Sequence, residues 1–123
     1  MTVNAETTFS GVSVDSQDVK RYAFILKLRP GTENDYDKAH ESVSPELIAL
    51  LKRVGISEYS IFRRDQLLFL TLAVDDFERA WQEVEIDPAY AVWQKIMAPF
   101  FEPVSDLRQG ERFPMMDEVF YMR

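Results

Sequence analysis

The residue best suited to acid–base chemistry in this chain is His40, because it is the sole histidine among 123 residues that include no cysteine. An unperturbed imidazole has a pKa of about 6.5, so it can take up and release a proton near neutral pH. Tyr36 lies four residues earlier, on the same face of a helix, where its phenol could bind a hydroxyl or polarise a ring oxygen. Each residue also has a structural interpretation, as a hydrogen-bonded histidine in a helix–sheet seam or as a core tyrosine.

Other side chains are weaker candidates for a site. Trp81 and Trp93 lie in apolar helical stripes, which is typical of core residues, although an indole can also stack on the apolar face of a sugar ring. Glu111, in a loop, and Glu118, in the last predicted strand, are carboxylates that could serve as acid or base. The sequence has no phosphate-binding loop and no nucleophile elbow, and a single histidine without cysteine predicts no metal site.

The composition indicates a folded domain, since 46% of the residues are hydrophobic and 13% are aromatic. A formal net charge of −7 argues against binding to nucleic acid, which needs clustered lysine and arginine. No apolar run approaches the roughly 20 residues that cross a bilayer, and the N-terminus lacks the pattern of a signal peptide. We therefore expect a soluble cytoplasmic protein with neither nucleic acid nor membrane as a partner.

The chain is expected to form a flexible N-terminal extension, 1–18, and one domain, 19–123. Residues 1–18 are rich in Thr, Ser, Val and Asp and show no sustained period, with one weak strand at most near residues 9–14. Alternating apolar residues begin after residue 19, which is where the domain is predicted to start.

The first half of the domain predicts a strand followed by a helix that breaks. Apolar residues alternate over residues 20–29, as in a strand with one buried face. Thr32 is expected to cap the next helix, in a capping box with Asp35. Ser44-Pro45 lies within the helical pattern, and a proline cannot continue a helix unbroken. We expect a kinked helix or two helices in series, with His40 just before the break.

The second half predicts a hairpin, two short helices and a last strand. The hairpin strands are 56–63 and 66–74, and the second is apolar on both faces, which is typical of a central strand. A loop over 104–114 and a strand over 117–122 end the chain. The two helices are expected to begin at Asp75 or Asp76 and at Asp87, and to turn inward Phe77, Trp81, Val84, Trp93, Ile96, Met97 and Phe100.

The resulting order, β-α-β-β-α-β, predicts an α+β fold of the ferredoxin-like type. In that fold a four-stranded antiparallel sheet carries its helices on one face. The other face would expose aromatic and aliphatic side chains, and covering it with a second copy is the usual solution. We therefore expect a homodimer with the two sheets facing each other.

Several short pieces, in order along residues 20–122, resemble one known family. They are Lys20-Arg-Tyr-Ala-Phe, Tyr36-x-x-x-His40, Ser44-Pro-Glu-Leu47, Gly55-Ile-Ser-Glu-Tyr-Ser-Ile-Phe62, Leu68-Phe69, Trp93-x-x-x-Met97 and Glu118-Val-Phe-Tyr121. Taken together they resemble the L-rhamnose mutarotase family, including its branch of L-fucose mutarotases. The stretch from Gly110-Glu-Arg-Phe113 to Met116 is more similar to the fucose branch.

The resemblance implies a cofactor-free isomerase on a dimeric α/β barrel, which interconverts the α and β anomers of a 6-deoxy-hexose such as L-rhamnose or L-fucose. His40 would be the catalytic proton-transfer residue. Tyr36 and Trp93 would bind the sugar, and Tyr59, in the matched segment around the hairpin, is a further candidate for substrate binding. Tyr36 or a carboxylate could be the partner of His40 in proton transfer.

Three positions depart from the family pattern. Ser44 stands where the family usually has tryptophan, Gln94 replaces the second residue of a Trp-Trp pair, and Glu41 replaces an Asn or Arg. These departures concern substrate recognition more than proton transfer. Ser44 and Gln94 keep open the alternative of a non-catalytic dimeric carbohydrate-binding or interaction module. A second alternative, a cofactor-free oxygenase or another enzyme on the same dimeric barrel, rests on analogy of fold alone.

Overall fold

The computed structural model of the protein describes residues 19–123, so the extension expected at 1–18, with its weak strand, lies outside the described residues. The strands are β1 (Lys20–Lys27), β2 (Ser57–Arg64), β3 (Leu67–Val74) and β4 (Met115–Met116). The helices are α1 (Glu33–Ala39), α2 (Pro45–Arg53), α3 (Phe77–Glu85) and α4 (Pro88–Met97), with short 3-10 helices η2 (His40–Ser42) and η3 (Ala98–Phe100).

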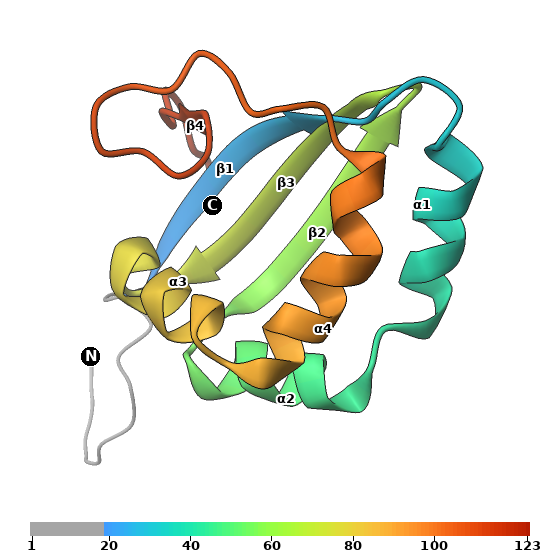
Figure 1. The fold of residues 1–123 in the computed structure, drawn as a ribbon. Helices are drawn as coiled ribbons and strands as arrows, with labels where there is room; N and C mark the ends of the chain where they lie inside the picture. Colours follow the sequence, from blue (N-terminus) through green and yellow to red (C-terminus); the bar gives the residue numbers. More distant parts are fainter. Residues whose placement is uncertain (1–18) are drawn as a thin grey trace, which may run out of the picture.

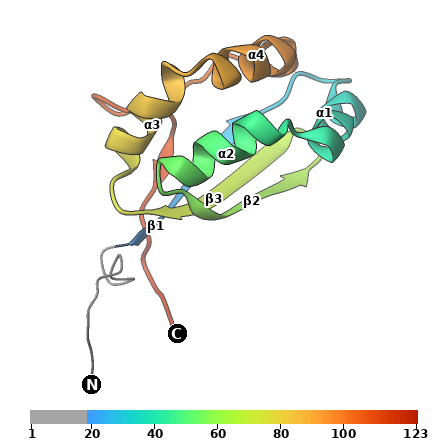
Figure 2. The ribbon, with the colours of Figure 1, turned by 90° about the horizontal axis from the view of Figure 1, so that it is seen from below.

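The strands form one antiparallel sheet in the order β2-β3-β1-β4, with all four helices on the same face (Figures 1 and 2). This order confirms the predicted α+β pattern with a four-stranded antiparallel sheet. Strand β3 lies between two neighbours, as its apolar character on both faces predicted. Within residues 19–123, no helix is long and apolar enough to cross a membrane.

Side chains alternate between the two faces of the sheet. Phe24, opposite Leu70, and Leu68, opposite Leu26, point toward the helices and are buried. Ile25 pairs with Phe69 on the opposite face. That second face carries no described helix, so the sheet is covered on one side only (Figure 2).

The first helix is broken in two, as Pro45 predicted. Helix α1 ends at Ala39, a 3-10 turn follows, and α2 begins at Pro45 with Ser44 as its N-cap. The Ser44 hydroxyl accepts a hydrogen bond from the Leu47 amide at 3.2 Å, which satisfies one of the free donors at the helix start. Gly55, at φ 95°, ends α2 in the left-handed conformation that favours glycine.

Two local predictions at helices were wrong. Thr32 is the N-cap residue of α1, as predicted, but its side chain caps no amide among the described residues, because its hydroxyl donates to the Arg29 carbonyl at 2.8 Å. The capping box with Asp35 therefore does not form. Ile96 is 46% exposed rather than inward, since only one side of α4 meets the sheet.

The predicted last strand is also wrong in position. The strand that pairs with β1 is Met115–Met116, and residues 117–122 have no partner strand in the described part of the chain. A strand needs a neighbour to share its hydrogen bonds, and the sequence of this segment does not show whether it has one.

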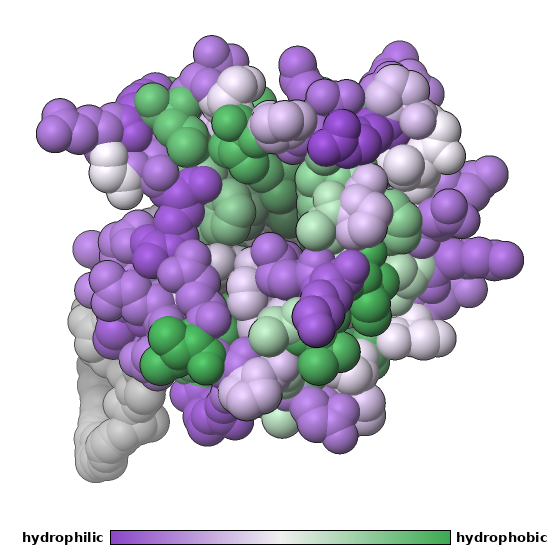
Figure 3. Space-filling model, in the orientation of Figure 1, coloured by the Kyte–Doolittle hydropathy of each residue, from purple (hydrophilic) through white to green (hydrophobic). Residues whose placement is uncertain are grey.

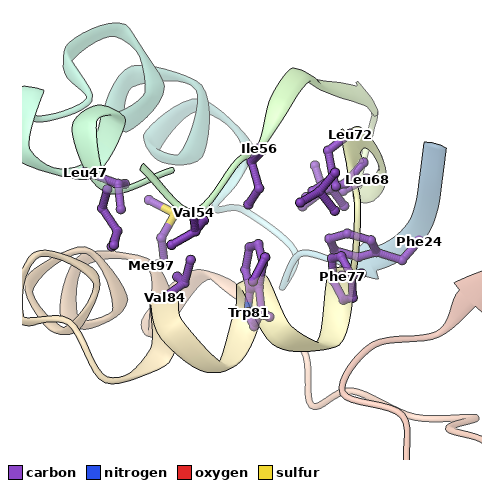
Figure 4. Packing of buried hydrophobic residues seen from close by; sticks show 14 of the residues in the cluster. Phe24, Leu47, Val54, Ile56, Leu68, Leu72, Phe77, Trp81, Val84 and Met97 are labelled. Atoms are coloured by element: carbon purple, nitrogen blue, oxygen red, sulfur yellow. The ribbon is translucent and has the colours of Figure 1, made fainter. Parts of the chain in front are cut away.

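The core lies between the helices and the covered face of the sheet (Figure 4). Phe77, Trp81 and Val84 of α3 point inward, as predicted, and meet Leu72 of β3 and Phe24 of β1 in the same cluster. The rings of Phe77 and Trp81 stack at 5.4 Å between centroids. This packing fixes α3 on the sheet and forms one wall of the site described below.

Leu72→Ala should lower the free energy of unfolding by about 2–5 kcal/mol, because Leu72 is 1% exposed and its removal leaves a cavity in the core. Ile86→Ala is the control, since Ile86 is 84% exposed and its loss should change stability by less than about 0.5 kcal/mol. Urea denaturation of both variants measures the difference. Equal losses would contradict the core assigned here.

Candidate functional site

A cavity of about 370 Å³ opens between the helices and the covered face of the sheet. Figure 3 shows a hollow with hydrophobic side chains on its floor, close to the C-terminal loop. Two aromatic groups line the cavity, one around His40 and one around Trp81. It therefore has the mixture of apolar walls and a few polar groups that is typical of a small-molecule site.

His40 takes its position from the break between the first two helices. It follows the last residue of α1, where the helix tightens into η2 and its ring is half-buried. The ring Nδ1 lies 2.9 Å from the backbone carbonyl of Tyr36. A carbonyl oxygen only accepts, so Nδ1 carries the proton and, in the neutral ring, Nε2 keeps its lone pair. Nε2 is thus the nitrogen able to take a proton from a ligand.

Two aromatic rings enclose the imidazole. The Tyr36 ring lies 4.3 Å from it, and Trp93 of α4 meets it edge-on at 5.0 Å and 88°. Both residues line the cavity beside His40. The sequence had placed Tyr36 and His40 on one helical face, and the structure brings Trp93 to them from more than fifty positions away.

Tyr36 and Tyr59, which both line the cavity, carry neutral phenols. Burial raises the pKa of Tyr36 well above its usual range, and the neighbouring Asp37 charge adds to the effect. Burial is also the main cause of the raised pKa of Tyr59, and the proximity of Tyr36 and Tyr90 raises it further. Both phenols consequently stay protonated at neutral pH and can donate hydrogen bonds to ligand oxygens.

An ion pair fixes α1 against the edge of the sheet. Arg63 of β2 donates to both carboxylate oxygens of Asp37, from Nε at 2.8 Å and Nη2 at 2.6 Å. Because Asp37 lies between Tyr36 and His40 along α1, this bidentate contact holds their helix beside β2. The hydrogen bond to Arg63 lowers the pKa of Asp37.

All four residues proposed from sequence, His40, Tyr36, Trp93 and Tyr59, line the same cavity. Gln94, one of the departures from the family pattern, lines it as well. The substitution at Ser44 is different, because Ser44 caps α2 and is not among the residues that line the cavity. Of the two positions that lack a family tryptophan, therefore, only Gln94 contributes to the cavity wall.

Of the second aromatic group, the sequence had indicated Trp81 alone, as a weaker candidate that was expected to belong to the core. Trp81, Tyr90 and Phe113 meet there, with the Trp81 ring 6.0 Å from Tyr90 and 5.6 Å from Phe113. Tyr90 lies one helical turn before Trp93 on α4, so helical spacing could have indicated it. Phe113 belongs to a loop, held to α3 by the ion pairs of Arg112 with Glu78 and Glu85. A loop residue has no period that a sequence could reveal.

Two charged residues at the cavity were also missed. Arg29 and Glu102 both line it, and Glu102 is the single carboxylate among the described residues that do so. The backbone amide of Glu102 donates a hydrogen bond to the backbone carbonyl of Lys27 at 2.9 Å. This contact places the chain after η3 beside the end of β1. By contrast, Glu111 accepts from the Arg108 amide and Glu118 pairs with Arg21, and neither lines the cavity.

The described residues, 19–123, contain no group of three histidine, cysteine, aspartate or glutamate side chains that could hold a metal ion. The residues that line the cavity can transfer protons at His40 or Glu102, donate hydrogen bonds from tyrosine hydroxyls and stack on aromatic rings.

Comparison with known proteins identifies relatives along nearly the whole described chain. A sequence model of the family described as L-rhamnose mutarotase matches residues 21–122. The L-rhamnose mutarotase of Bacteroides thetaiotaomicron is 50% identical over 106 residues, covering 85% of this chain and 99% of the relative. That of Sinorhizobium medicae is 37% identical over 91 residues, covering 72% and 86%.

Solved structures show the same fold. The crystal structure of an L-rhamnose mutarotase from Formosa agariphila superposes with a TM-score of 0.68 at 31% identity, covering 85% of this chain and 99% of that one. Tetracenomycin F2 cyclase from Streptomyces glaucescens, a type-II polyketide cyclase, superposes with a TM-score of 0.60 at 19% identity and covers 85% and 96%. The likeness to the cyclase concerns the fold alone.

Asp37→Asn should weaken the pH dependence of stability in acid. The pKa of Asp37 is lower in the folded state than in the unfolded state, so the ionised carboxylate stabilises the folded protein at pH values above the unfolded-state pKa of about 3.9. This contribution is lost as the pH falls through the pKa of the folded state. Between pH 6 and pH 3 the wild type should therefore lose more stability than the variant. The difference should be small, because the pair is partly exposed, and smaller still in about 1 M salt.

Urea denaturation at several pH values measures this effect. Asp35→Asn is the matched control, since Asp35 is exposed on the same helix and forms no ion pair among the described residues. The control should keep the pH dependence of the wild type. If Asp37→Asn and Asp35→Asn behave alike, the Asp37–Arg63 pair does not fix α1 as described.

Proposed function

The chain belongs to the L-rhamnose mutarotase family, and we propose that it is an isomerase that interconverts the α and β anomers of L-rhamnose by acid–base ring opening. The observation that carries this proposal is the arrangement at His40. One imidazole with a free Nε2 lines an aromatic cavity that is also lined by two tyrosines whose phenols stay protonated.

The cavity has a suitable size for one monosaccharide. An apolar cavity of about 150 Å³ holds benzene, which has six heavy atoms. A 6-deoxy-hexose has about eleven heavy atoms by the same count, so a cavity of about 370 Å³ accommodates it with room to turn. Room to turn matters, because the open-chain aldehyde must rotate before the ring closes again.

The reaction asks for two coordinated proton movements. Nε2 of His40 takes the proton of the anomeric hydroxyl while the bond between C1 and the ring oxygen breaks and the ring oxygen gains a proton. The aldehyde group then rotates, and the former ring oxygen attacks the opposite face of C1. The two proton transfers run in reverse as the ring closes. No covalent bond to the protein forms, no group is oxidised, and no cofactor enters the proposal. Orientation and general acid–base help are sufficient.

The other cavity residues have distinct proposed roles. Trp93, edge-on to His40, offers an indole face to the sugar ring. The hydroxyls of Tyr36 and Tyr59 donate to sugar oxygens, and Tyr36 is closest to His40 in the chain and in its ring contact. Either Tyr36 or Glu102 gives the ring oxygen its proton. Glu102 is proposed because it is the carboxylate that lines the cavity.

We further propose that the protein is a homodimer that forms a dimeric α/β barrel. The uncovered face of the sheet exposes large apolar side chains, among them Phe62 at 61%, Leu67 at 45% and Met116 at 48%. Facing a second sheet would bury them. Sedimentation at micromolar concentration should give the mass of two chains. A single-chain mass would remove the dimer while leaving the proposed chemistry untouched.

His40→Ala should slow anomer exchange of L-rhamnose by about 10²- to 10⁴-fold, because it removes the proposed general base. Saturation-transfer NMR between the two anomers measures the rate above the buffer background. Lys38→Gln is the control, since Lys38 is exposed on the same helix, and it should keep the wild-type rate. The same measurement on L-fucose decides between the two 6-deoxy sugars.

The outcomes of these experiments distinguish the proposed mutarotase from a non-catalytic protein and test the assignment of His40. Wild-type protein without exchange on either sugar would refute the mutarotase and leave a non-catalytic sugar-binding module. A folded His40→Ala protein with the wild-type rate would refute the assignment of His40. Tyr36→Phe and Glu102→Gln then identify the residue that protonates the ring oxygen, because loss of that residue should reduce the exchange rate more than loss of the other.

A further inference from the structure

The half of the cavity around Trp81 carries polar groups that the proposed reaction does not use. Trp81 of α3, Tyr90 of α4 and Phe113 of the C-terminal loop meet there and line the cavity together. Phe113 is wholly apolar, but Trp81 brings an indole N–H and Tyr90 brings a hydroxyl to this aromatic wall. Buried polar groups need hydrogen-bond partners, so each of these two groups calls for one.

The indole nitrogen of Trp81 lacks a partner. Trp81 is 5% exposed, and within residues 19–123 its Nε1 is the one buried side-chain nitrogen or oxygen that makes no hydrogen bond. Figure 4 shows the ring extending from α3 into the core, away from bulk water. A buried donor without an acceptor is costly and rare in folded proteins. Its acceptor must therefore come from a neighbouring side chain or from a ligand.

Tyr90 offers that acceptor. Its ring meets the Trp81 ring nearly edge-on, at 6.0 Å between centroids and 80° between planes. Burial raises the pKa of Tyr90, and the Trp81 side chain opposes this rise, which is the effect of a donor directed toward the phenol oxygen. The two groups thus lie close to each other but outside normal hydrogen-bond geometry. A small movement of either ring completes the bond.

A phenol oxygen that accepts from Trp81 still has its own proton to donate. Tyr90 is half-buried and lines the cavity, so the cavity is the open space toward which this proton can turn. Tyr59 lies close enough to both Tyr36 and Tyr90 for both to raise its pKa. Three phenols, from α1, β2 and α4, therefore gather around one cavity.

The place of Tyr90 on α4 determines which part of a sugar it can reach. Tyr90 lies three residues before Trp93, so the two side chains are neighbours about one helical turn apart. Trp93 is the one that meets the His40 ring, at 5.0 Å. With the anomeric carbon at His40 and the sugar ring beside Trp93, Tyr90 faces the other end of the sugar. In a pyranose ring, the hydroxyls on C3 and C4 lie at that end.

We propose that Tyr90 is a further sugar-binding residue whose hydroxyl donates to the C3 or C4 hydroxyl of the substrate, and that Trp81 is a positioning residue that donates to the Tyr90 oxygen. The inference rests on the proposed isomerase and adds the contact that holds the sugar at the end distant from His40. The indole N–H, the phenol and the sugar then form one chain of hydrogen bonds in which each group has a partner.

Such a contact suits the proposed reaction. The aldehyde at C1 has to rotate while the remaining carbons stay in place, and a hydrogen bond at C3 or C4 holds those carbons without restricting C1. It therefore keeps the open chain in the cavity until the ring closes again.

Tyr90→Phe removes the hydroxyl and keeps the ring. The KM for L-rhamnose in anomer exchange should rise about three- to tenfold, which corresponds to one neutral hydrogen bond. The kcat should change less than about twofold, because the contact is the same before and during ring opening. Tyr22→Phe is the matched control, since Tyr22 packs on Phe77 at 5.4 Å and is not among the described residues that line the cavity. Saturation-transfer NMR at several sugar concentrations measures both variants.

Deoxy sugars distinguish a contact with the sugar from a structural role of the Tyr90 hydroxyl. Either 3-deoxy- or 4-deoxy-L-rhamnose should give the same KM with wild type and with Tyr90→Phe, because it lacks the hydroxyl that Tyr90 binds. 2-Deoxy-L-rhamnose keeps both hydroxyls and should show the full rise in KM. A purely structural role would instead raise the KM by the same factor with every sugar.

Trp81→Phe, alone and combined with Tyr90→Phe, tests the positioning role. The single variant should raise the KM, but in the Tyr90→Phe chain it should add less than about twofold, since the phenol oxygen it positions is then absent. A loss that comes from packing alone would persist in both chains. Full additivity of the two losses would thus overturn the role of Trp81.

The proposed function and the role of Tyr90 fail in different ways. Wild-type protein that binds L-rhamnose in an NMR titration without exchanging its anomers refutes the isomerase. The dissociation constants of wild type and Tyr90→Phe then replace KM in the same comparison. Three results would overturn the role of Tyr90: no binding of L-rhamnose by the wild type, an unchanged KM or dissociation constant in Tyr90→Phe, or equal losses with all three deoxy sugars.

Discussion

The break between α1 and α2 is the constraint from which the site follows. Pro45 cannot extend α1, so the helix ends at Ala39 and His40 lies in a 3-10 turn at the edge of the cavity. There the Tyr36 carbonyl accepts both the backbone N–H and the ring Nδ1–H of His40. One carbonyl thereby fixes the ring and its tautomer. In an unbroken helix the same imidazole would lie among the residues of a continuous buried face.

The two faces of the sheet have separate proposed roles. Its covered face, where Phe24, Leu70 and Ile61 point toward the helices, supplies the floor of the cavity. Its uncovered face carries apolar residues such as Phe62 and Phe69 and takes no part in the cavity. The two faces can therefore be satisfied independently, the first by a small ligand and the second by another chain. This separation is why dimer contacts and catalysis are expected to respond to different substitutions.

Local pattern predicted much of the fold and half of the site. Alternation in β1 and β3 and the break at Pro45 depend on neighbouring residues alone, so they could be read directly. The last strand was misplaced because a strand also depends on a partner that the sequence does not show. Arg29 and Glu102 reach the cavity from irregular segments, where no period reveals which side chain turns inward. The pairing of Trp93 with His40 depended on packing between distant helices.

The distribution of charge suits a neutral ligand. The chain carries a formal net charge of −7, yet the cavity wall consists mainly of aromatic rings, with Arg29 and Glu102 as the charged side chains among its described residues. Anion binding would call for several converging cations, whereas a sugar needs hydroxyl partners and flat apolar surfaces. Because the proposed ring opening passes through a neutral aldehyde, it requires little stabilisation of charge. Two phenols that burial keeps protonated and one imidazole are therefore a sufficient set of groups.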